Sequence, residues 1–252
     1  MDIKDSLCID KVYVLSVKSF SDRITHIKNE LTKHNLEFEF IFDYDIDEIN
    51  LPDFSKKNVL IEDNLQNAHK SLLLKHIKAW ENCVQNNYKN ILILEDDVLL
   101  DKNFSNTLKK IIHRSSYLTP GYLIFLSGRD TRVPKEFLLS NDLLFRHPIA
   151  TADGYITDFH ACIKRLAWLS NNKVNLPADH LIKKIDENLE ISQYWSTKTL
   201  VEQGSVFGLF PSTLDRNRQK HTLLYNFLRY YMKIFTRRFL KKIALKVTFK
   251  KI

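Results

Sequence analysis

Three consecutive carboxylates, Glu95, Asp96 and Asp97, directly follow four apolar residues at positions 91–94. An uninterrupted apolar run of this length is typical of a strand buried on both faces of a parallel sheet. Ligands of open α/β sheets bind outside the carboxyl ends of the strands, so the carboxylates are expected at a ligand-binding edge. Because Glu95 and Asp97 are two positions apart, their side chains point the same way in an extended chain. This pair could hold a divalent cation, Mn²⁺ or Mg²⁺, that bridges the diphosphate of a nucleotide.

The same carboxylates could instead cap a following helix or simply face solvent. A buried strand that ends in three adjacent like charges is unfavourable unless a cation compensates them, and this favours the metal site. His180 could add a ligand, because a neutral imidazole suits a transition ion such as manganese. We therefore predict a metal site with Glu95, Asp97 and His180 as ligands.

Other polar residues have both a functional and a structural interpretation. Arg23 could clamp a phosphate, or it could be a solvated charge at the start of a helix. His76 lies among apolar residues of a helix, which is typical of a structural histidine, although a place in the ligand pocket stays open. Arg129, Asp130 and Arg132 follow a strand, where they could line the site or form a charged turn.

The elements that must position these side chains alternate between strand and helix patterns. Strands are predicted at 12–17, 38–42, 91–94, 122–126 and 206–210, helices at 23–33, 66–86, 164–171 and 177–189, and a loop-rich region at 127–157. Such an alternation indicates an α/β fold with a mostly parallel central sheet covered by helices.

The net charge of +8 is concentrated near the C-terminal end of the sequence. Residues 216–252 contain 12 Lys or Arg and no acid, whereas residues 1–215 carry 26 basic against 30 acidic side chains. We therefore divide the chain into a domain at 1–215 and a basic tail at 216–252. Three separated cysteines without a CxxC pair, and the lack of a leader-like or membrane-spanning apolar run, lead us to expect a cytoplasmic protein.

Apolar residues of the tail recur every three or four positions from Leu223 to Phe235, with Lys and Arg on another face. This pattern predicts a basic amphipathic helix that lies on an anionic membrane surface. Aromatic residues interleaved with lysines could instead bind nucleic acid, and a helix packed on the domain would also show a solvated basic face. The membrane interpretation is preferred, and no nucleic acid is expected as a partner.

A set of short motifs occurs in order between residues 11 and 215. They are Val12-Tyr13-Val14-Leu15-Ser16-Val17 with Ser21-Asp22-Arg23, Leu74-Lys75-His76 with Trp80, Leu94-Glu95-Asp96-Asp97-Val98, His160-Ala161-Cys162-Ile163, Pro177-Ala178-Asp179-His180, and Ser212-Thr213-Leu214. Together they resemble the family 25 glycosyltransferases, the bacterial sugar transferases of lipooligosaccharide and lipopolysaccharide synthesis. The chain departs from the family pattern at Ser16, which stands in place of an Asn, and at Lys75, which stands in place of a Ser. It also has Ala68 and Ser71 where the family has a Gly-rich approach to the helix.

The resemblance implies a GT-A-like nucleotide-binding fold and inverting transfer of a hexose, often galactose, from a UDP-sugar to a glycolipid saccharide. It places Arg23, His76 and the three acids in the donor site. One-step inversion needs a base that takes the proton of the acceptor hydroxyl, and a metal that stabilises the departing diphosphate. Asp179 is the first candidate for the base, with Asp153 and Asp158 as alternatives. A lipid-linked acceptor would place the protein on the inner face of the cytoplasmic membrane.

Two other functions fit parts of the sequence. A metal-dependent nucleotidyltransferase would also use paired carboxylates after a strand, and it would release pyrophosphate instead of a nucleoside diphosphate. A non-enzymatic nucleic-acid-binding protein would depend on the basic tail, and its binding would be sensitive to salt.

Overall fold

The computed structural model describes residues 9–49, 61, 65–126, 142–148 and 150–210, and in the tail residues 224, 225, 228, 231, 232, 235, 236 and 239. The strands are β1 (Lys11–Leu15), β2 (Glu39–Ile41), β3 (Asn90–Glu95), β4 (Val98–Leu100), β5 (Tyr122–Phe125), β6 (Leu144–Arg146), β7 (Gly154–Asp158), β8 (Ser192–Ser196) and β9 (Val201–Gln203). The helices are α1 (Ser21–Lys33), the 3-10 turn η1 (Ile46–Glu48), α3 (Asn67–Gln85), α4 (Phe104–Ser115), α6 (Phe159–Leu169), α7 (Ala178–Asn188) and α8 (Gly204–Phe207). The predicted domain boundary after residue 215 lies outside the described residues.

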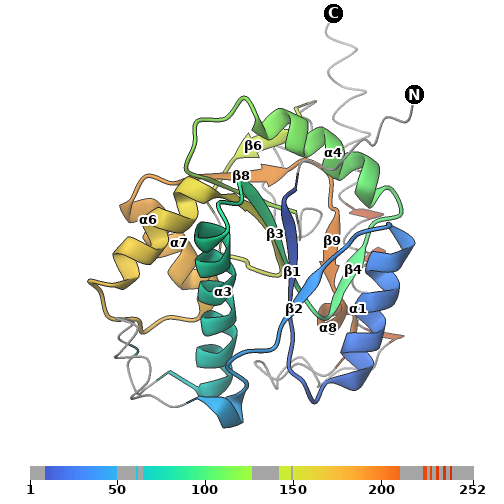
Figure 1. The fold of residues 1–252 in the computed structure, drawn as a ribbon. Helices are drawn as coiled ribbons and strands as arrows, with labels where there is room; N and C mark the ends of the chain where they lie inside the picture. The colour runs from blue at the N-terminus through green and yellow to red at the C-terminus, as the bar shows by residue number, and fades with distance from the viewer. Residues whose placement is uncertain are drawn as a thin grey trace, which may run out of the picture.

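A mixed sheet forms the centre of the described fold, with the strand order β2-β1-β3-β7-β5-β8-β6 (Figure 1). Strands β2, β1, β3, β5 and β8 run in one direction, whereas β7 and β6 run in the opposite direction. The prediction of an α/β fold with a mostly parallel central sheet is confirmed. A separate two-stranded antiparallel pair, β4 with β9, follows the carboxyl end of β3.

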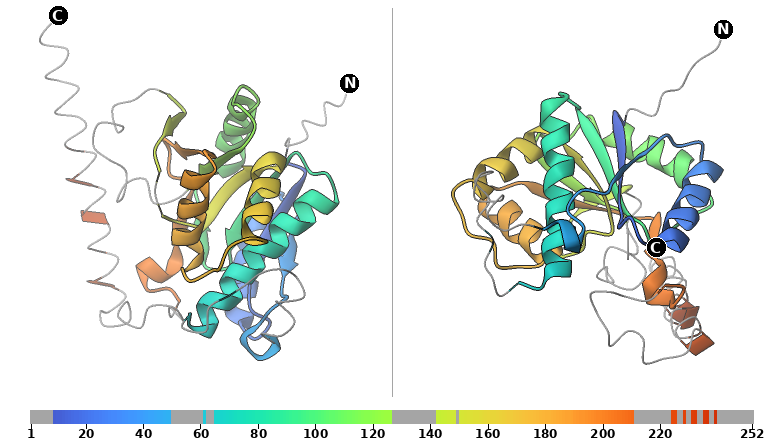
Figure 2. Two further views of the ribbon diagram at one scale, coloured as in Figure 1. Left: turned by 90° about the vertical axis from the view of Figure 1, so that its left-hand side faces the viewer. Right: turned by 60° about the horizontal axis from the view of Figure 1, so that its bottom comes forward.

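The sheet is buried on both faces, as the apolar run at 91–94 predicts. Ile91 and Ile93 belong to one core cluster, which α3, α6 and α7 cover, while Leu92 and Leu94 belong to a second cluster beneath α1 and α4. The alternation follows from the period of two along a strand. Figure 2 shows these two groups of helices on opposite sides of the sheet.

Strand β7 corrects the prediction that residues 127–157 are loop-rich. Its five residues are all buried, and it pairs with both β3 and β5 in the middle of the sheet. Glycine often interrupts a strand, but Gly154 allows close packing: a Cβ at this position would lie 2.9 Å from Val201 Cγ1 and 3.2 Å from Leu94 Cδ2. The sequence pattern could not show that this glycine sits under two other strands.

Two further element predictions need correction. The predicted strand at 206–210 is wrong, because α8 occupies 204–207 and ends at Gly208, whose φ of 77° is the left-handed conformation that commonly terminates helices. The helix predicted at 164–171 begins at Phe159, because the Asp158 carboxylate accepts the Ala161 N–H at 3.0 Å and caps its first turn.

A fully buried ion pair joins two helices to the sheet. Arg165 on α6 donates through Nε and Nη2 to the two carboxylate oxygens of Asp186 on α7, each at 2.8 Å. Arg165 Nη1 donates to Thr157 Oγ1 on β7 at 2.8 Å, and Gln193 Nε2 on β8 donates to Asp186 at 2.9 Å. The guanidinium also lies 5.2 Å from the centroid of the Trp80 ring. The network therefore fixes α3, α6 and α7 against β7 and β8.

We predict that Asp186→Ala lowers the free energy of unfolding by about 3–5 kcal/mol, because it leaves a buried guanidinium without its counter-charge. Urea unfolding followed by circular dichroism measures the change. Glu187→Ala, which removes a half-exposed carboxylate from the same helix, should change the free energy by only about 0.5 kcal/mol. Equal losses in the two variants would contradict the prediction.

Candidate active site

The acidic triplet lies where the strand order of the sheet reverses. From β1 the chain first passes to β2 on one side and then returns to β3 on the other side of β1. In open α/β sheets this switch point forms a crevice at the carboxyl ends of the two strands, where ligands bind. Ser16 follows β1 and Asp96 follows β3, and Ser16 Oγ donates to Asp96 Oδ2 at 2.8 Å. The sequence-based placement of the triplet at a ligand-binding edge agrees with this topology.

Asp96 is the acid of the triplet that the protein itself engages most fully. Its Oδ2 accepts the Ser16 hydroxyl, and its Oδ1 accepts Arg23 Nη1 at 2.9 Å. The Arg23 guanidinium also lies 5.2 Å from the Phe20 ring centroid and 5.7 Å from that of Phe210. Asp96 thus ties α1 to the end of β3. The predicted roles of Arg23 and Asp96 in donor binding stay predictions, since the contacts described here are internal.

Asp97 is held by the turn that begins α8. Its backbone carbonyl accepts the Gly204 N–H at 2.7 Å, and its Oδ2 accepts the Ser205 N–H at 3.2 Å. A Cβ on residue 204 would lie 2.6 Å from the Asp97 carbonyl oxygen, so only glycine allows this approach. Among the described residues, the second carboxylate oxygen, Asp97 Oδ1, is buried without a hydrogen-bond partner. A buried acceptor in this state is costly unless something outside the described contacts binds it.

Glu95 faces a concentration of negative charge. Its Oε2 accepts Gln203 Nε2 at 3.3 Å, and its backbone N–H donates to the Asp153 carbonyl at 3.0 Å. Burial, followed by the charges of Asp97, Asp153 and Asp96, raises the pKa of Glu95 well above its ordinary value. Burial likewise raises the pKa of Asp97, against the opposing charge of Arg23. Nearby positive charge only partly compensates the cluster.

These features fit a divalent cation that Glu95 and Asp97 share. A cation would satisfy the buried Asp97 oxygen and stabilise the ionised forms of both carboxylates, which burial and the neighbouring acids disfavour. In the part of the chain that the structure describes, no three His, Cys, Asp or Glu side chains form a ready-made ligand set. Mg²⁺ sites commonly use one or two carboxylates, with substrate phosphates and water completing the shell. The two carboxylates therefore fit a site that a phosphate-bearing substrate completes.

Asp179 and His180 begin α7, whose first turn lies at the same edge of the sheet. The helix leads into β8, which runs parallel to β5, so its N-terminus must lie at the carboxyl ends of the parallel strands. Asp179 is half-buried and His180 is exposed, and the described contact between them is local: His180 N donates to Asp179 Oδ1 at 2.9 Å. Among the described residues, no contact joins this turn to the triplet, so the roles of Asp179 and His180 stay predictions.

The two alternative bases lie at opposite ends of strand β7. Asp153 precedes β7, next to Glu95, and its carboxylate accepts the hydroxyl of Thr151. Asp158 ends β7 opposite Asn90, the first residue of β3. The Asp158 carboxylate accepts three backbone N–H groups, from residues 121, 122 and 161. Asp158 therefore has a structural role away from the crevice.

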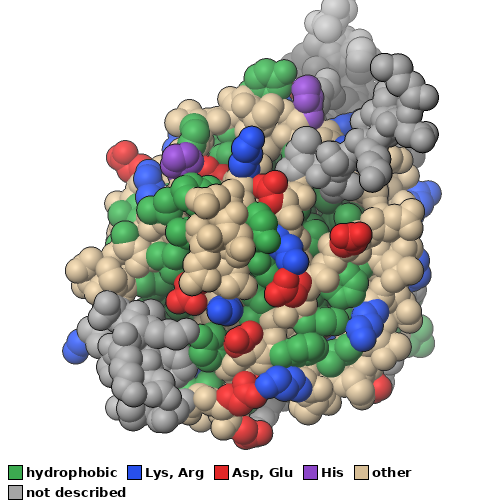
Figure 3. Space-filling model, in the orientation of Figure 1, with side chains coloured by type: hydrophobic (Ala, Val, Ile, Leu, Met, Phe, Trp, Pro, Cys, Tyr) green, Lys and Arg blue, Asp and Glu red, His purple; other side chains and the backbone are tan. Residues whose placement is uncertain are grey.

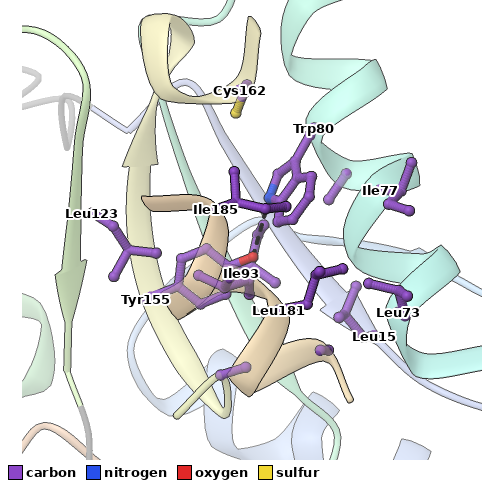
Figure 4. Packing of buried hydrophobic residues seen from close by; sticks show 14 of the residues in the cluster. Leu15, Leu73, Ile77, Trp80, Ile93, Leu123, Tyr155, Cys162, Leu181 and Ile185 are labelled. Carbon is purple, nitrogen blue, oxygen red and sulfur yellow. Dashed lines mark hydrogen bonds between the residues drawn. The ribbon is translucent and has the colours of Figure 1, made fainter. Parts of the chain in front are cut away.

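The His76 side chain extends from α3 into the hydrophobic core. It is fully buried, and its Nδ1 pairs with the Tyr155 hydroxyl at 2.9 Å, to which Trp80 Nε1 donates at 3.1 Å. Figure 4 shows the Trp80–Tyr155 pair among apolar side chains. Burial and the charge of Arg165 lower the pKa of His76 to about 3, so the imidazole is neutral at physiological pH. These contacts match the structural interpretation, and the pocket role stays a prediction.

Sequence reasoning did not identify the second segment that builds the site. Gln203, Gly204 and Ser205 contact the triplet although they are more than 100 residues away in the chain. A glycine between polar residues is the only local signal, and it does not indicate a partner. The predicted loop residues Arg129, Asp130 and Arg132 lie outside the described residues.

An α/β sheet with a carboxylate cluster at its switch point is consistent with a nucleotide-binding fold. A family model described as glycosyltransferase family 25 (LPS biosynthesis protein) matches residues 9–138, just over half of the chain. The chain belongs to glycosyltransferase family 25, and the resemblance stated from its motifs is confirmed.

Two proteins of Haemophilus influenzae are similar to part of the chain. The lipooligosaccharide biosynthesis protein lic2B is 33% identical over 93 residues, which cover 36% of this chain and 35% of that protein. A protein of strain Rd, named provisionally as a glycosyltransferase, is 32% identical over 101 residues, or 38% and 36% of the two chains. The similarity thus spans little more than a third of either relative.

The raised pKa of Glu95 predicts how stability depends on pH. Because folding raises this pKa above 4.5, the folded state keeps a proton that the unfolded state loses, and stability contributed by this group falls as the pH rises above about 4.5. Glu95→Gln should therefore stabilise the metal-free protein at pH 8 and have less effect at pH 5. Urea unfolding in EDTA measures both values. Glu37→Gln, at an exposed carboxylate, serves as the control, and an equal effect of Glu95→Gln at both pH values would contradict this interpretation.

Proposed function

We propose that the protein is an inverting, metal-dependent glycosyltransferase with a GT-A-like domain. It transfers a hexose, with galactose favoured, from a UDP-sugar to a saccharide of lipooligosaccharide or lipopolysaccharide. The observation that carries the proposal is the buried Asp97 Oδ1 beside Glu95 at the β1–β3 switch point, which has no hydrogen-bond partner within the described part of the chain. Family membership supports a sugar transferase, and the name of lic2B supports a lipooligosaccharide acceptor.

The residues around the crevice have different roles in binding the donor. Glu95 and Asp97 would hold Mn²⁺ or Mg²⁺, which supplies positive charge where the diphosphate leaves. Asp96 keeps the end of β3 in place through Ser16 and Arg23. The turn that begins α8 fixes Asp97 by two backbone N–H groups, so its carboxylate need not reorganise when a ligand binds.

Asp179 is the proposed base that accepts the proton of the acceptor hydroxyl. Its half-buried position in the first turn of α7, at the carboxyl edge of the sheet, supports this role. Asp153 is the alternative, because it lies beside Glu95. A base variant should bind UDP normally but turn over slowly. Loss of UDP binding in Asp179→Asn would instead place Asp179 in the donor site.

We predict that Asp97→Asn folds normally but lowers sugar transfer by about 100-fold or more, since the amide keeps the shape and removes the charge that holds the metal. The assay follows UDP release from a panel of UDP-sugars with Mn²⁺, Mg²⁺ or EDTA. The matched control is Asp22→Asn, an exposed first-turn carboxylate of α1. Unchanged activity and metal dependence in Asp97→Asn would overturn the proposed function, while release of pyrophosphate would indicate a nucleotidyltransferase.

The exposed side chains of the tail support a membrane partner. Described tail residues have helical backbone, and seven of them are large apolar side chains that are 49–67% exposed: Leu224, Tyr225, Leu228, Tyr231, Met232, Phe235 and Phe239. Their spacing of three or four positions places them along one helical face, and the segment carries 12 basic residues without an acid. On the face of the molecule in Figure 3, basic and acidic side chains are intermingled.

Such a helix fits the surface of an anionic bilayer, where apolar side chains enter the interface and each basic residue adds about 1 kcal/mol. We propose that the tail holds the protein on the inner face of the cytoplasmic membrane, next to its glycolipid acceptor. The described helices include none with the length and hydropathy to cross a bilayer. Nucleic acid is the less favoured partner, because Leu224, Leu228 and Met232 are exposed but have no aromatic ring on which a base could stack.

We predict that Leu228→Glu/Phe235→Glu reduces binding to vesicles of anionic lipid by about tenfold or more, without loss of UDP-sugar hydrolysis. Co-sedimentation with vesicles measures binding, and high salt or purely zwitterionic lipid should weaken binding of the unchanged protein. Tyr117→Glu, at an aromatic side chain that is 68% exposed on the domain, is the control. If the double variant binds vesicles as well as the control, the tail is not the membrane contact.

A further inference from the structure

A lysine is buried near the carboxyl edge of the sheet, where such a side chain requires a specific partner. Lys75 on α3 is 2% exposed, and its Nζ donates to the Asp43 carbonyl and to Asp45 Oδ1, each at 2.7 Å. Both acceptors belong to the segment that follows β2. Burial lowers the pKa of Lys75, while the Asp45 carboxylate opposes that change. The ion pair thus joins a helix on one face of the sheet to the chain beyond β2.

Asp45 also contacts the segment between β1 and α1. Its second oxygen, Oδ2, accepts the backbone N–H of Lys18 at 2.9 Å. We call residues 16–20 the β1 loop, which connects the end of β1 to the start of α1. At its first residue, the Ser16 hydroxyl donates to Asp96, and the Ser16 N–H donates to the Ile41 carbonyl at 3.3 Å. The β1 loop is therefore held at Ser16 by Asp96 and by the Ile41 carbonyl. At Lys18 it is held by the buried Asp45 carboxylate and by an exposed ion pair with Glu48.

The β1 loop borders the switch-point crevice between β1 and β3. In nucleotide-binding α/β folds the first strand-to-helix turn lies against the ligand. A loop that is already fixed before the ligand arrives loses less conformational freedom on binding, which strengthens the affinity. The attachment of the loop at the Lys18 amide depends in turn on the Lys75–Asp45 ion pair, which holds the accepting carboxylate in place.

We propose that Lys75 is a positioning residue for the nucleotide donor, acting through Asp45 on the β1 loop. This role rests on the proposed function in taking a nucleotide as the ligand. Lys75 does not touch the donor. The ammonium holds the Asp45 carboxylate, the carboxylate holds the Lys18 amide, and the loop keeps the shape that the nucleotide meets.

The variants separate this role from a general loss of stability. Lys75→Met alone leaves the Asp45 carboxylate buried without its counter-charge and is expected to destabilise the fold. Lys75→Met/Asp45→Leu removes both charges together, and replacing both partners by apolar groups can be nearly neutral for stability. The double variant should therefore stay folded and lose the hydrogen bond between the Lys18 amide and residue 45, while the exposed Lys18–Glu48 ion pair remains. Lys78→Met, on the same helix and half-buried, is the control.

Amide hydrogen exchange followed by NMR tests the attachment without any ligand. In the double variant, the Lys18 amide and its loop neighbours should exchange at least about tenfold faster, because a hydrogen-bonded amide becomes free. The β1 and β3 amides should keep their protection. Unchanged exchange at Lys18 would overturn the proposal, whatever the identity of the donor.

Calorimetric titration with UDP, GDP, ADP and CMP in Mg²⁺ tests the consequence for binding. The nucleotide that the unchanged protein binds should bind the double variant roughly tenfold more weakly, with turnover at saturating donor little changed. Wild-type affinity in the double variant, despite faster loop exchange, would overturn the positioning role. Preference of the unchanged protein for a nucleotide other than UDP would instead contradict the proposed UDP-sugar donor, and the effect on that nucleotide's affinity would still decide the role of Lys75.

Discussion

The concentration of carboxylates at the carboxyl end of β3 is the constraint on which the site depends. Glu95, Asp97 and Asp153 lie together where burial raises the cost of charge, and the Arg23 guanidinium, which pairs with Asp96, offsets part of the negative charge at Asp97. Like charges in a poorly solvated setting repel strongly, so the surrounding elements must hold them in position. Two backbone N–H groups of the α8 turn and a hydrogen bond from Gln203 do this. The arrangement leaves a negative site that a cation would stabilise.

The three acids are adjacent in sequence but differ in their surroundings. Asp96 faces α1, and both of its oxygens are occupied, so it joins elements of the fold. Asp97 faces the α8 turn, and its Oδ1 has no hydrogen-bond partner in the ranges that the structure describes. Glu95 lies beside Asp153, whose carbonyl accepts its backbone N–H. A single charged motif thus combines a structural contact with two side chains that are suited to a ligand.

The face of the sheet that α3, α6 and α7 cover contributes rigidity. There the Arg165–Asp186 pair and the His76–Tyr155–Trp80 hydrogen bonds fill the space between the sheet and α3, α6 and α7. Every buried charge in the Arg165 network has a partner at hydrogen-bond distance. Since α3 also carries Lys75, this packed layer supports the loops at the crevice through the same helix that it anchors.

The sequence by itself determined the α/β class, the buried strand at 91–94, the position of the acidic triplet at its end, and the family. These features depend on local periodicity and on short motifs, which can be recognised in the sequence without knowledge of the tertiary contacts. Tertiary structure alone decided that β7 runs antiparallel in the middle of the sheet, that residues 204–207 form a helical turn against Asp97, and that Lys75 reaches Asp45. Each of these depends on a contact between distant segments, and the local pattern around β7 and α8 favoured a loop and a strand instead. The meaning of a polar residue such as Asp158 or His76 likewise came from its partners, because a carboxylate or an imidazole has the same sequence signal whether it binds a ligand or caps a helix.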